Sequence, residues 1–487
     1  MAILSNDITK DVSNRANTYN VGTISAVLTL SGFFCMLSET VLNMALKSMM
    51  VQFSISANTV QWLSTGYMLI MGISIPISAF LIQSFKTRQL FVSSMLFFIF
   101  GTIISGFAPI FPILLIGRLI QAVGTGMLIP NIVNTLIIIN PEDKRGKALG
   151  IFNLVMFFAP ALGPIFSGVI IQALNWRWLF FIIVPFSTLA LILGCIYLEN
   201  VTKLSSPKID VLSIILSTIG FGCLIYGVSN IGNSAISMMV VPLLVGCASL
   251  AVFVVRQLSL KEPMLDMNAF RYPMFSIGTV LIIIMHMVNF SIMLMLPIFM
   301  EGAMGLSAFT AGLMMLPGGL INGIAAPIAG SLYDKYGPKV LIFPGFLLST
   351  IVFAILSQVI SVSVSIPVII VLHCCSLLAV GMINTPTQTN SLNQLTPELY
   401  PHGTAITNTL QQIGGALGTS LFVAIMTAGQ NNYLANAGKH DAESQALALA
   451  AGVRQSLSVA VIVLIIGLVL SFFLKRNSNG VRKAQLV

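Results

Sequence analysis

Two charged residues stand apart because they lie inside long apolar runs of the sequence. Glu39 is the one acidic residue and Arg118 the one basic residue that we place within such runs. A charge is costly to hold in an apolar environment, so residues of this kind are candidates for function. The surroundings of a buried carboxyl group decide whether it holds a proton. Glu39, with Arg118 as its basic partner, could therefore take up and release a proton; the competing interpretation places Glu39 at a membrane interface, where it merely reaches water.

A histidine is the next candidate for proton chemistry. His286 lies midway along another apolar run, and Asn289 follows one helical turn later. A neutral imidazole changes its charge near physiological pH, which is what proton coupling requires. A lone buried histidine is more often a structural residue, so both interpretations of His286 stay open, and His373 is a weaker candidate of the same kind.

The apolar runs are the elements that must position these residues. The chain has 487 residues, of which 56% are hydrophobic and 8% charged, against about 25% charged in an ordinary soluble domain. A helix needs about 20 apolar residues to cross a bilayer. Fourteen runs approach or exceed that length: 21–43, 59–82, 90–108, 112–137, 148–172, 178–198, 211–231, 238–255, 274–299, 310–332, 340–358, 366–389, 404–428 and 457–474. The sequence predicts an all-α polytopic membrane protein.

The positive charge of the chain follows this topology. The net charge is +9, which in a soluble protein would suggest a nucleic-acid partner. With the N-terminus in the cytoplasm, 18 Lys and Arg fall on the inner side, 4 on the outer side and one within a span. This asymmetry predicts that both termini are cytoplasmic, and it argues against nucleic acid. All six cysteines fall within spans, so we expect neither a disulfide framework nor a metal site or other cofactor.

An internal repeat divides the chain. Runs one to six match runs nine to fourteen at offsets of 251 to 256 residues, with shared positions that include Pro76/Pro327, Arg88/Lys339, Pro130/Pro386, Asn134/Asn390 and Asn153/Asn408. Apolar composition alone could repeat Leu or Ala but not these spacings. We therefore expect an N-terminal six-helix bundle over 1–200, a linker with two inserted helices over 201–272, and a C-terminal six-helix bundle over 273–487.

The loop after the second run, residues 79–88, and its copy at 330–339 resemble the cytoplasmic signature of the major facilitator superfamily. In that family the acidic and basic residues of the loop latch neighbouring helices. The copy keeps Asp334 and Lys339, whereas the first loop has Gln83 together with Arg88, so its latch must rely on neutral hydrogen bonds. The alternative is a pair of plain turns with stop-transfer charges.

Three further segments carry the resemblance, and one of them, around Glu39, resembles a narrower group, the 14-span drug:proton antiporters. The fifth run has Gly163, Pro164 and Gly168 where the superfamily has its antiporter signature, although ordinary packing of small residues is the alternative. Around Glu39 the chain reads Ser-Glu-Thr-Val-Leu-Asn-Met-Ala-Leu, and the acid beside the threonine is similar to the lincomycin-resistance-like branch. The segment at Arg118 is similar to the Arg-x-x-Gln-Gly pattern, with Ala122 in place of glycine.

The resemblance implies a monomeric, proton-coupled exporter of amphipathic or lipophilic compounds in the cell membrane, working by alternating access. It implies a cavity between the first, fourth, ninth and twelfth spans, where Asn43, Gln121, Asn289, Asn384 and Gln388 would bind substrate and Glu39, Arg118 and His286 would couple protons. An exporter of one endogenous metabolite, lipid or signalling molecule is the alternative. No catalytic constellation indicates an enzyme, and the outer stretch 429–455, with a possible short helix over 441–453, has no assigned role.

Overall fold

The computed structural model describes residues 21–140, 142–201, 210–231, 236–260, 263–396, 399–438 and 441–475. The side chains of several helical residues are not described, and Gln83 and Asp334 are among them. Every regular element in the described part of the chain is a helix. Inside a bilayer this is expected, because a helix pairs its backbone groups within one segment.

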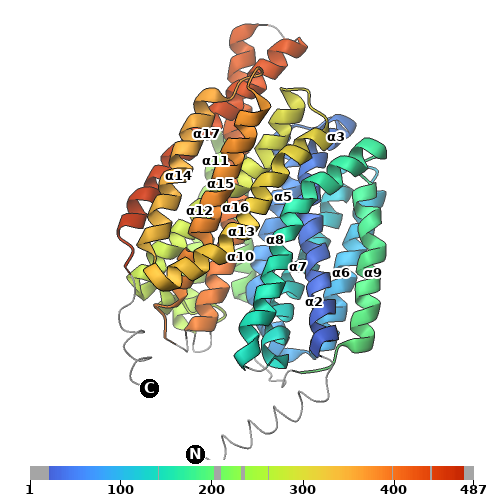
Figure 1. Ribbon diagram of the computed structural model, residues 1–487, viewed down its shortest axis with the longest axis vertical. Coiled ribbons are helices and arrows are strands. Elements are labelled where there is room, and N and C mark those ends of the chain that lie inside the picture. Colours follow the sequence, from blue (N-terminus) through green and yellow to red (C-terminus); the bar gives the residue numbers. More distant parts are fainter. Residues whose placement is uncertain are drawn as a thin grey trace, which may run out of the picture.

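The N-terminal helices occupy one side of the molecule. They are α2 (Val21–Thr40), η1 (Val41–Ala45), α3 (Leu46–Phe53), α4 (Ala57–Val60), α5 (Trp62–Ser84), α6 (Thr87–Phe107), α7 (Phe111–Ile139), α8 (Glu142–Ala173) and α9 (Trp178–Tyr197). In Figure 1 they run from blue to green, beside the yellow to red C-terminal helices, and α8 and α13 lie where the two groups meet.

The C-terminal group comprises α12 (Pro273–Gly302), α13 (Ala308–Tyr336), α14 (Lys339–Val359), α15 (Ile366–Leu392), α16 (Tyr400–Ala437) and α17 (Ala442–Phe472). Between the two groups in sequence come α10 (Val211–Ser229), α11 (Ile236–Ser259) and the short η2 (Met267–Arg271). In the described residues, 12 helices are long and apolar enough to cross a membrane. Helices α5 and α8 occupy the two other predicted runs, so each predicted span coincides with a helix.

The inserted helices α10 and α11 form a tied pair. Asp210 caps α10 by accepting a hydrogen bond from the Ser213 amide, and Arg256 of α11 donates to both of its carboxylate oxygens, with the closest contacts at 2.9 Å. These bonds hold the pKa of the Asp210 carboxyl below its usual value. Helix α10 also contacts α5 and α16, which belong to different groups of helices. The pair therefore rests against the line where the N-terminal and C-terminal helices meet.

Most of the outer stretch 429–455 belongs to two long helices, and the short helix expected over 441–453 is the first part of the second one. Helix α16 continues to Ala437, and α17 begins at Ala442 and runs unbroken into the membrane span. Figure 1 shows this helical pair rising above the other helices. Alanine favours helix, Gly438 turns the chain with φ +64°, and the Asp441 carboxylate caps α17 by accepting from the Ser444 amide at 2.9 Å. Local helix signals therefore extend both spans instead of producing a separate short helix.

Candidate functional site

A cavity of about 180 Å³ lies between the N-terminal and C-terminal helices. Helices α2 and α8 form one side of it, and α12, α13 and α15 form the other. Its polar lining residues are Glu39, Thr40, His286, Asn289, Asn322, His373 and Asn384; its apolar lining residues include Met36, Pro164, Met285, Phe290, Met293 and Met315. We call it the central cavity. Flexible methionines and a phenylalanine beside a few polar groups suit an amphipathic molecule.

Several polar atoms of the central cavity lack partners. Asn289 Oδ1, Asn384 Oδ1 and His373 Nδ1 are buried and have no hydrogen bond to any described residue. A buried polar atom left in this way costs about 1 to 3 kcal/mol. A molecule that entered the cavity with its own donors and acceptors would recover part of that cost. The arrangement therefore favours ligand binding over pure packing.

One ring nitrogen of His286 is hydrogen-bonded to the backbone of its own helix. Its Nδ1 lies 2.9 Å from the carbonyl oxygen of Ile282, one turn earlier. A carbonyl only accepts, so Nδ1 carries the hydrogen and Nε2 is left with a lone pair in the neutral ring. The ring lies 6.0 Å from that of Phe290, centroid to centroid. His286 can therefore accept one further hydrogen bond, or a proton, at Nε2.

Glu39 lines the central cavity on the side formed by α2. Its side chain is 8% exposed, and in the described structure its carboxyl group makes no hydrogen bond and no ion pair. A carboxyl group in that position has no fixed partner to hold its charge state. Its protonation can therefore respond to what occupies the cavity.

Arg118 lies behind this wall in a polar network that does not face the cavity. Its guanidinium is fully buried, lies 4.2 Å from the centre of the Tyr67 ring, and donates to the Ser38 carbonyl oxygen at 3.3 Å. It also donates to Gln121 Oε1, and Gln121 Nε2 donates to Ser38 Oγ at 2.8 Å and Thr102 Oγ1 at 2.7 Å. No ion pair between Glu39 and Arg118 is present in the described residues. The two charges are connected through Ser38, the neighbour of Glu39.

Of the five expected substrate-binding residues, two line the central cavity and three do not. Asn289 and Asn384 line the central cavity. Gln121 belongs to the Arg118 network, Gln388 donates to Asn408 Oδ1 at 3.2 Å, and Asn43 lies half-buried in η1; none of these three lines the cavity. Asn322 was missed, since nothing in the α13 sequence distinguishes it from a helix-packing amide.

Helices α8 and α13 approach each other closely at Pro164 and Gly168, two of the residues singled out by sequence. A Cβ added to Gly168 would lie 2.7 Å from Phe309 Cα, and one added to Gly312 would lie 2.3 Å from the carbonyl oxygen of Pro164. Gly163 instead faces α2, where an added Cβ would lie 2.4 Å from the side-chain Oγ1 of Thr40. Close backbone approach requires small residues on both helices. Of the expected latch residues, the side chains of Gln83 and Asp334 lie outside the described residues, while Arg88 and Lys339 are exposed near the start of α6 and α14.

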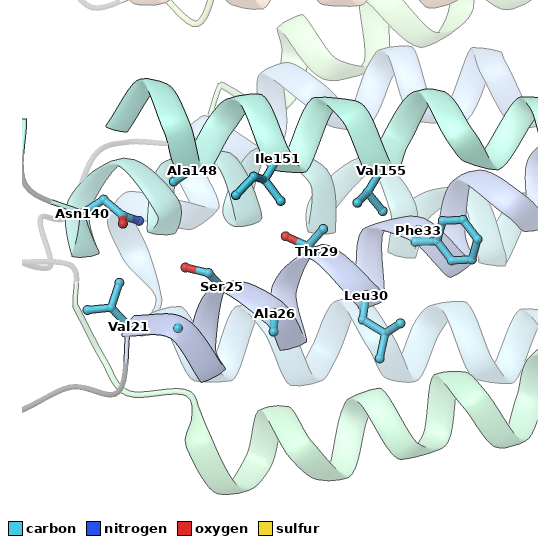
Figure 2. Close-up of a pocket in the computed structure, with 11 residues that line it drawn as sticks. Val21, Ser25, Ala26, Thr29, Leu30, Phe33, Asn140, Ala148, Ile151 and Val155 are labelled. Carbon is cyan, nitrogen blue, oxygen red and sulfur yellow. The ribbon is translucent and has the colours of Figure 1, made fainter. Parts of the chain in front are cut away.

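Further contacts between the two groups of helices gather at the end opposite to the start of α2. Lys47 Nζ donates to the Glu301 backbone carbonyl, the Thr65 and Thr419 hydroxyls lie 2.7 Å apart, and Thr427 donates to Asn58 at 3.1 Å. We call this the outer end, and the end where α2 begins the inner end. At the inner end a pocket of about 610 Å³ lies between α2 and α8, with Ser25 and Thr29 on one wall and Ile151 and Val155 on the other (Figure 2). These contacts join the two groups at the outer end. Two separate hollows lie beside α2 and α8: the inner pocket, which extends to Phe33, and the central cavity, which Met36 and Glu39 line.

The comparisons with known proteins agree with this architecture. The family model of the Major Facilitator Superfamily matches residues 28–419. The Lincomycin resistance protein LmrB of Bacillus subtilis is 48% identical over 96% of this chain and 99% of its own, and that of Listeria monocytogenes is 45% identical over 93% and 96%. The crystal structure of a bacterial homolog to the human lysosomal transporter Spinster shares the fold, with a TM-score of 0.70 at 14% identity over 93% of this chain and 96% of that one. This chain therefore belongs to the major facilitator superfamily and, within it, to the group of the lincomycin resistance proteins.

Proposed function

We propose that the protein is a proton-coupled multidrug exporter that expels amphipathic, lipophilic compounds from the cell by alternating access. The observation that carries the proposal is the central cavity, where an unpartnered acid, Glu39, faces unpartnered hydrogen-bonding atoms of Asn289, Asn384 and His373. The names of the relatives, which refer to lincomycin resistance, support a drug as the cargo. We place the chain in the cell membrane as a monomer with both termini cytoplasmic.

The geometry supports the following cycle. A compound reaches the cavity from the inner end, where the amide and imidazole atoms find its polar groups and the methionines cover its apolar body. The outer contacts, among them the close approach of α8 and α13 at Gly312, then separate and the inner end closes. Glu39 takes a proton from the outside as the compound leaves, and gives that proton to the cytoplasm after the return. One proton moves inward for each release, which supplies the driving force.

Proton-driven efflux in inverted vesicles tests this proposal. An imposed proton gradient, acid inside the vesicle, should drive uptake of a fluorescent lipophilic dye by the native chain and not by Glu39→Gln. Dye binding to Glu39→Gln should persist, because the amide keeps the shape of the carboxyl group but cannot release a proton at neutral pH. Glu443→Gln is the matched control, since Glu443 is exposed on the outer part of α17.

The outcomes separate the alternatives. Gradient-driven uptake that survives in Glu39→Gln would remove Glu39 from the coupling path and direct the search to His286 or the buried Glu301. Uptake of neither dye nor lincomycin by the native chain, with a gradient verified in the same vesicles, would refute the multidrug proposal in favour of a dedicated metabolite exporter.

A further inference from the structure

A second cavity, of about 230 Å³, lies where the inserted helices meet the central ones. One wall of the cavity is formed by the inserted helices, with Ile214, Ser217 and Phe221 of α10 and Phe253 of α11. The opposite wall is formed by the central helices and includes Gly72 of α5 and Thr409 of α16. The segment around Met267 and Phe270 closes its inner end. Because α10 begins, α11 ends and α16 begins at the inner end, this lateral cavity lies in the half of the membrane nearest the start of α2.

The lining of the lateral cavity is apolar apart from hydroxyl groups. Phe253, Ile406 and Thr409 in its wall are 5%, 1% and 4% exposed, whereas Val254 and Phe270 at its edge are 38% and 37% exposed. A cavity with a buried floor and an exposed edge, in a chain surrounded by lipid, can be reached from the acyl chains. An apolar cavity of about 150 Å³ already holds benzene, so the lateral cavity has room for a substituted aromatic ring.

One buried group in the cavity wall points to a ligand with a polar end. Thr409 Oγ1 has no hydrogen-bond partner among the described residues. By contrast, the Ser217 hydroxyl on the opposite wall is satisfied by the Ile214 carbonyl at 3.0 Å. An acyl chain would leave the Thr409 hydroxyl unpaired, at the usual cost of a buried polar group. A small molecule with one hydroxyl, carbonyl or amine beside an apolar ring would satisfy it.

The lateral cavity also borders both groups of helices, through α5 and α16. Gly72 in its wall faces α16 so closely that an added Cβ would lie 3.2 Å from Gln412 Cβ. Beside Thr409 in sequence, Asn408 accepts from Gln388 at 3.2 Å. Gln388 lies one helical turn from Asn384 of the central cavity. One hydrogen bond between α15 and α16 therefore lies close in sequence to a residue of each cavity, Asn384 and Thr409.

We propose that the lateral cavity is a second binding site, which takes small aromatic amphiphiles from the inner half of the membrane and holds their polar group against Thr409. That these compounds are cargo awaiting transfer to the central cavity rests on the proposed function. The binding itself does not.

Fluorescence quenching of the full-length protein in lipid nanodiscs tests the site. A Phe221→Trp substitution places a reporter in the wall of the lateral cavity, and the unsubstituted chain, with its three native Trp, gives the background. Para-bromophenol and bromobenzene are the quenchers, since they share the ring and differ by the hydroxyl. We expect saturable quenching of the reporter by para-bromophenol.

Three variants of the reporter protein test where the small molecule binds and which group holds it. Ser217→Phe should fill the cavity and abolish saturable quenching, whereas Thr218→Phe, which adds the same ring to an exposed neighbour, should leave it unchanged. Thr409→Val keeps the shape and removes the hydroxyl, so para-bromophenol should bind roughly two- to tenfold more weakly while bromobenzene is unaffected.

Two results would overturn the proposal. One is the absence of saturable quenching by either small molecule. The other is quenching by phosphatidylcholine with brominated acyl chains that para-bromophenol cannot displace, which would make the cavity a lipid-chain site. Because no gradient is imposed, these binding results are independent of transport. If binding fails while gradient-driven efflux is intact, only the lateral site is refuted. If binding is intact and efflux is absent, only the proposed function is refuted.

Discussion

Gly312→Ala should separate the two groups of helices at a close backbone contact. The added methyl carbon would lie 2.3 Å from the Pro164 oxygen, 2.7 Å from its carbonyl carbon and 3.2 Å from the Ile165 nitrogen. All three are backbone atoms, so no side chain can turn away to make room. Ordinary contact needs roughly 3.5 Å, and α8 and α13 must therefore move apart by about 1 Å.

In the proposed alternating-access cycle, the cost of this movement falls on one conformation only. Overpacking of a tight contact costs about 1 to 3 kcal/mol, and here that cost destabilises the state in which the outer ends are joined. Since about 1.4 kcal/mol is a factor of ten in an equilibrium constant, the population should shift about 5- to 150-fold toward the outward-open state. A transporter that depends on both states should then slow down.

Electron-paramagnetic-resonance distances between spin labels measure this shift. Labels at Val51 of α3 and Ser363 after α14 lie on the outer ends of the two groups, and both positions are exposed. With the native cysteines replaced, Gly312→Ala should give a longer distance distribution and slower dye efflux. Gly222→Ala, where an added Cβ meets nothing within 4 Å, should leave both unchanged. Identical distributions and rates for the two variants would refute the idea that α8 and α13 are held by this contact.

Three other substitutions probe the ties between helices. Asp210→Asn removes the carboxylate that accepts hydrogen bonds from Arg256. Because the pKa of Asp210 is below its unfolded value of about 3.9, this carboxylate stabilises the fold by about 1 kcal/mol or less at neutral pH, and the stabilisation disappears as the pH falls through the folded pKa. Thermal unfolding temperatures of native and variant protein should therefore differ at pH 7 and converge in acid. Arg118→Lys should lower stability by about 1 to 3 kcal/mol and impair efflux, because a lysine cannot stack on Tyr67 while donating to Ser38 and Gln121; unchanged melting would contradict this. Thr65→Val breaks a contact across the outer end and should raise the outward-open population by roughly two- to tenfold in the spin-label experiment.

The helices could be predicted from the sequence because the membrane allows so few alternatives. A long apolar run must form a helix there, and the fourteen runs do coincide with helices. Their ends were less predictable, since helices continue into water where capping and alanine permit. The run that ends at Asn43 continues through η1 and α3 to Phe53, and the span that begins at Leu457 is the later part of a helix that starts at Ala442.

The candidate site was only partly predictable, because helical phase does not give depth. Asn384 and Gln388 share a face of α15, yet four residues move Gln388 about 6 Å along the axis, past the cavity and against Asn408. The same limit applies to Gln121, which is one turn from Arg118 and is used to hold it. Sequence could identify polar residues in apolar helices, but only the packing of neighbours decides which become satisfied and which face open space.

The division between satisfied and unsatisfied groups suggests how a proton could move helices. Ser38 and Glu39 are consecutive on α2, and Ser38 belongs to the Arg118 network while Glu39 faces the central cavity. Any turn of α2 that follows a change in the charge of Glu39 must therefore stretch or relax the hydrogen bonds that Ser38 makes with α7. Arg118 retains two buried donors, Nε and Nη2, without partners in the described structure, so the network has unused capacity to receive a new acceptor. In the proposed cycle, a Glu39 carboxylate that has lost its proton would be an acceptor of opposite charge for these donors, and the hydrogen bonds of Ser38 would transmit that attraction to α7, the helix that contacts α5 and α6.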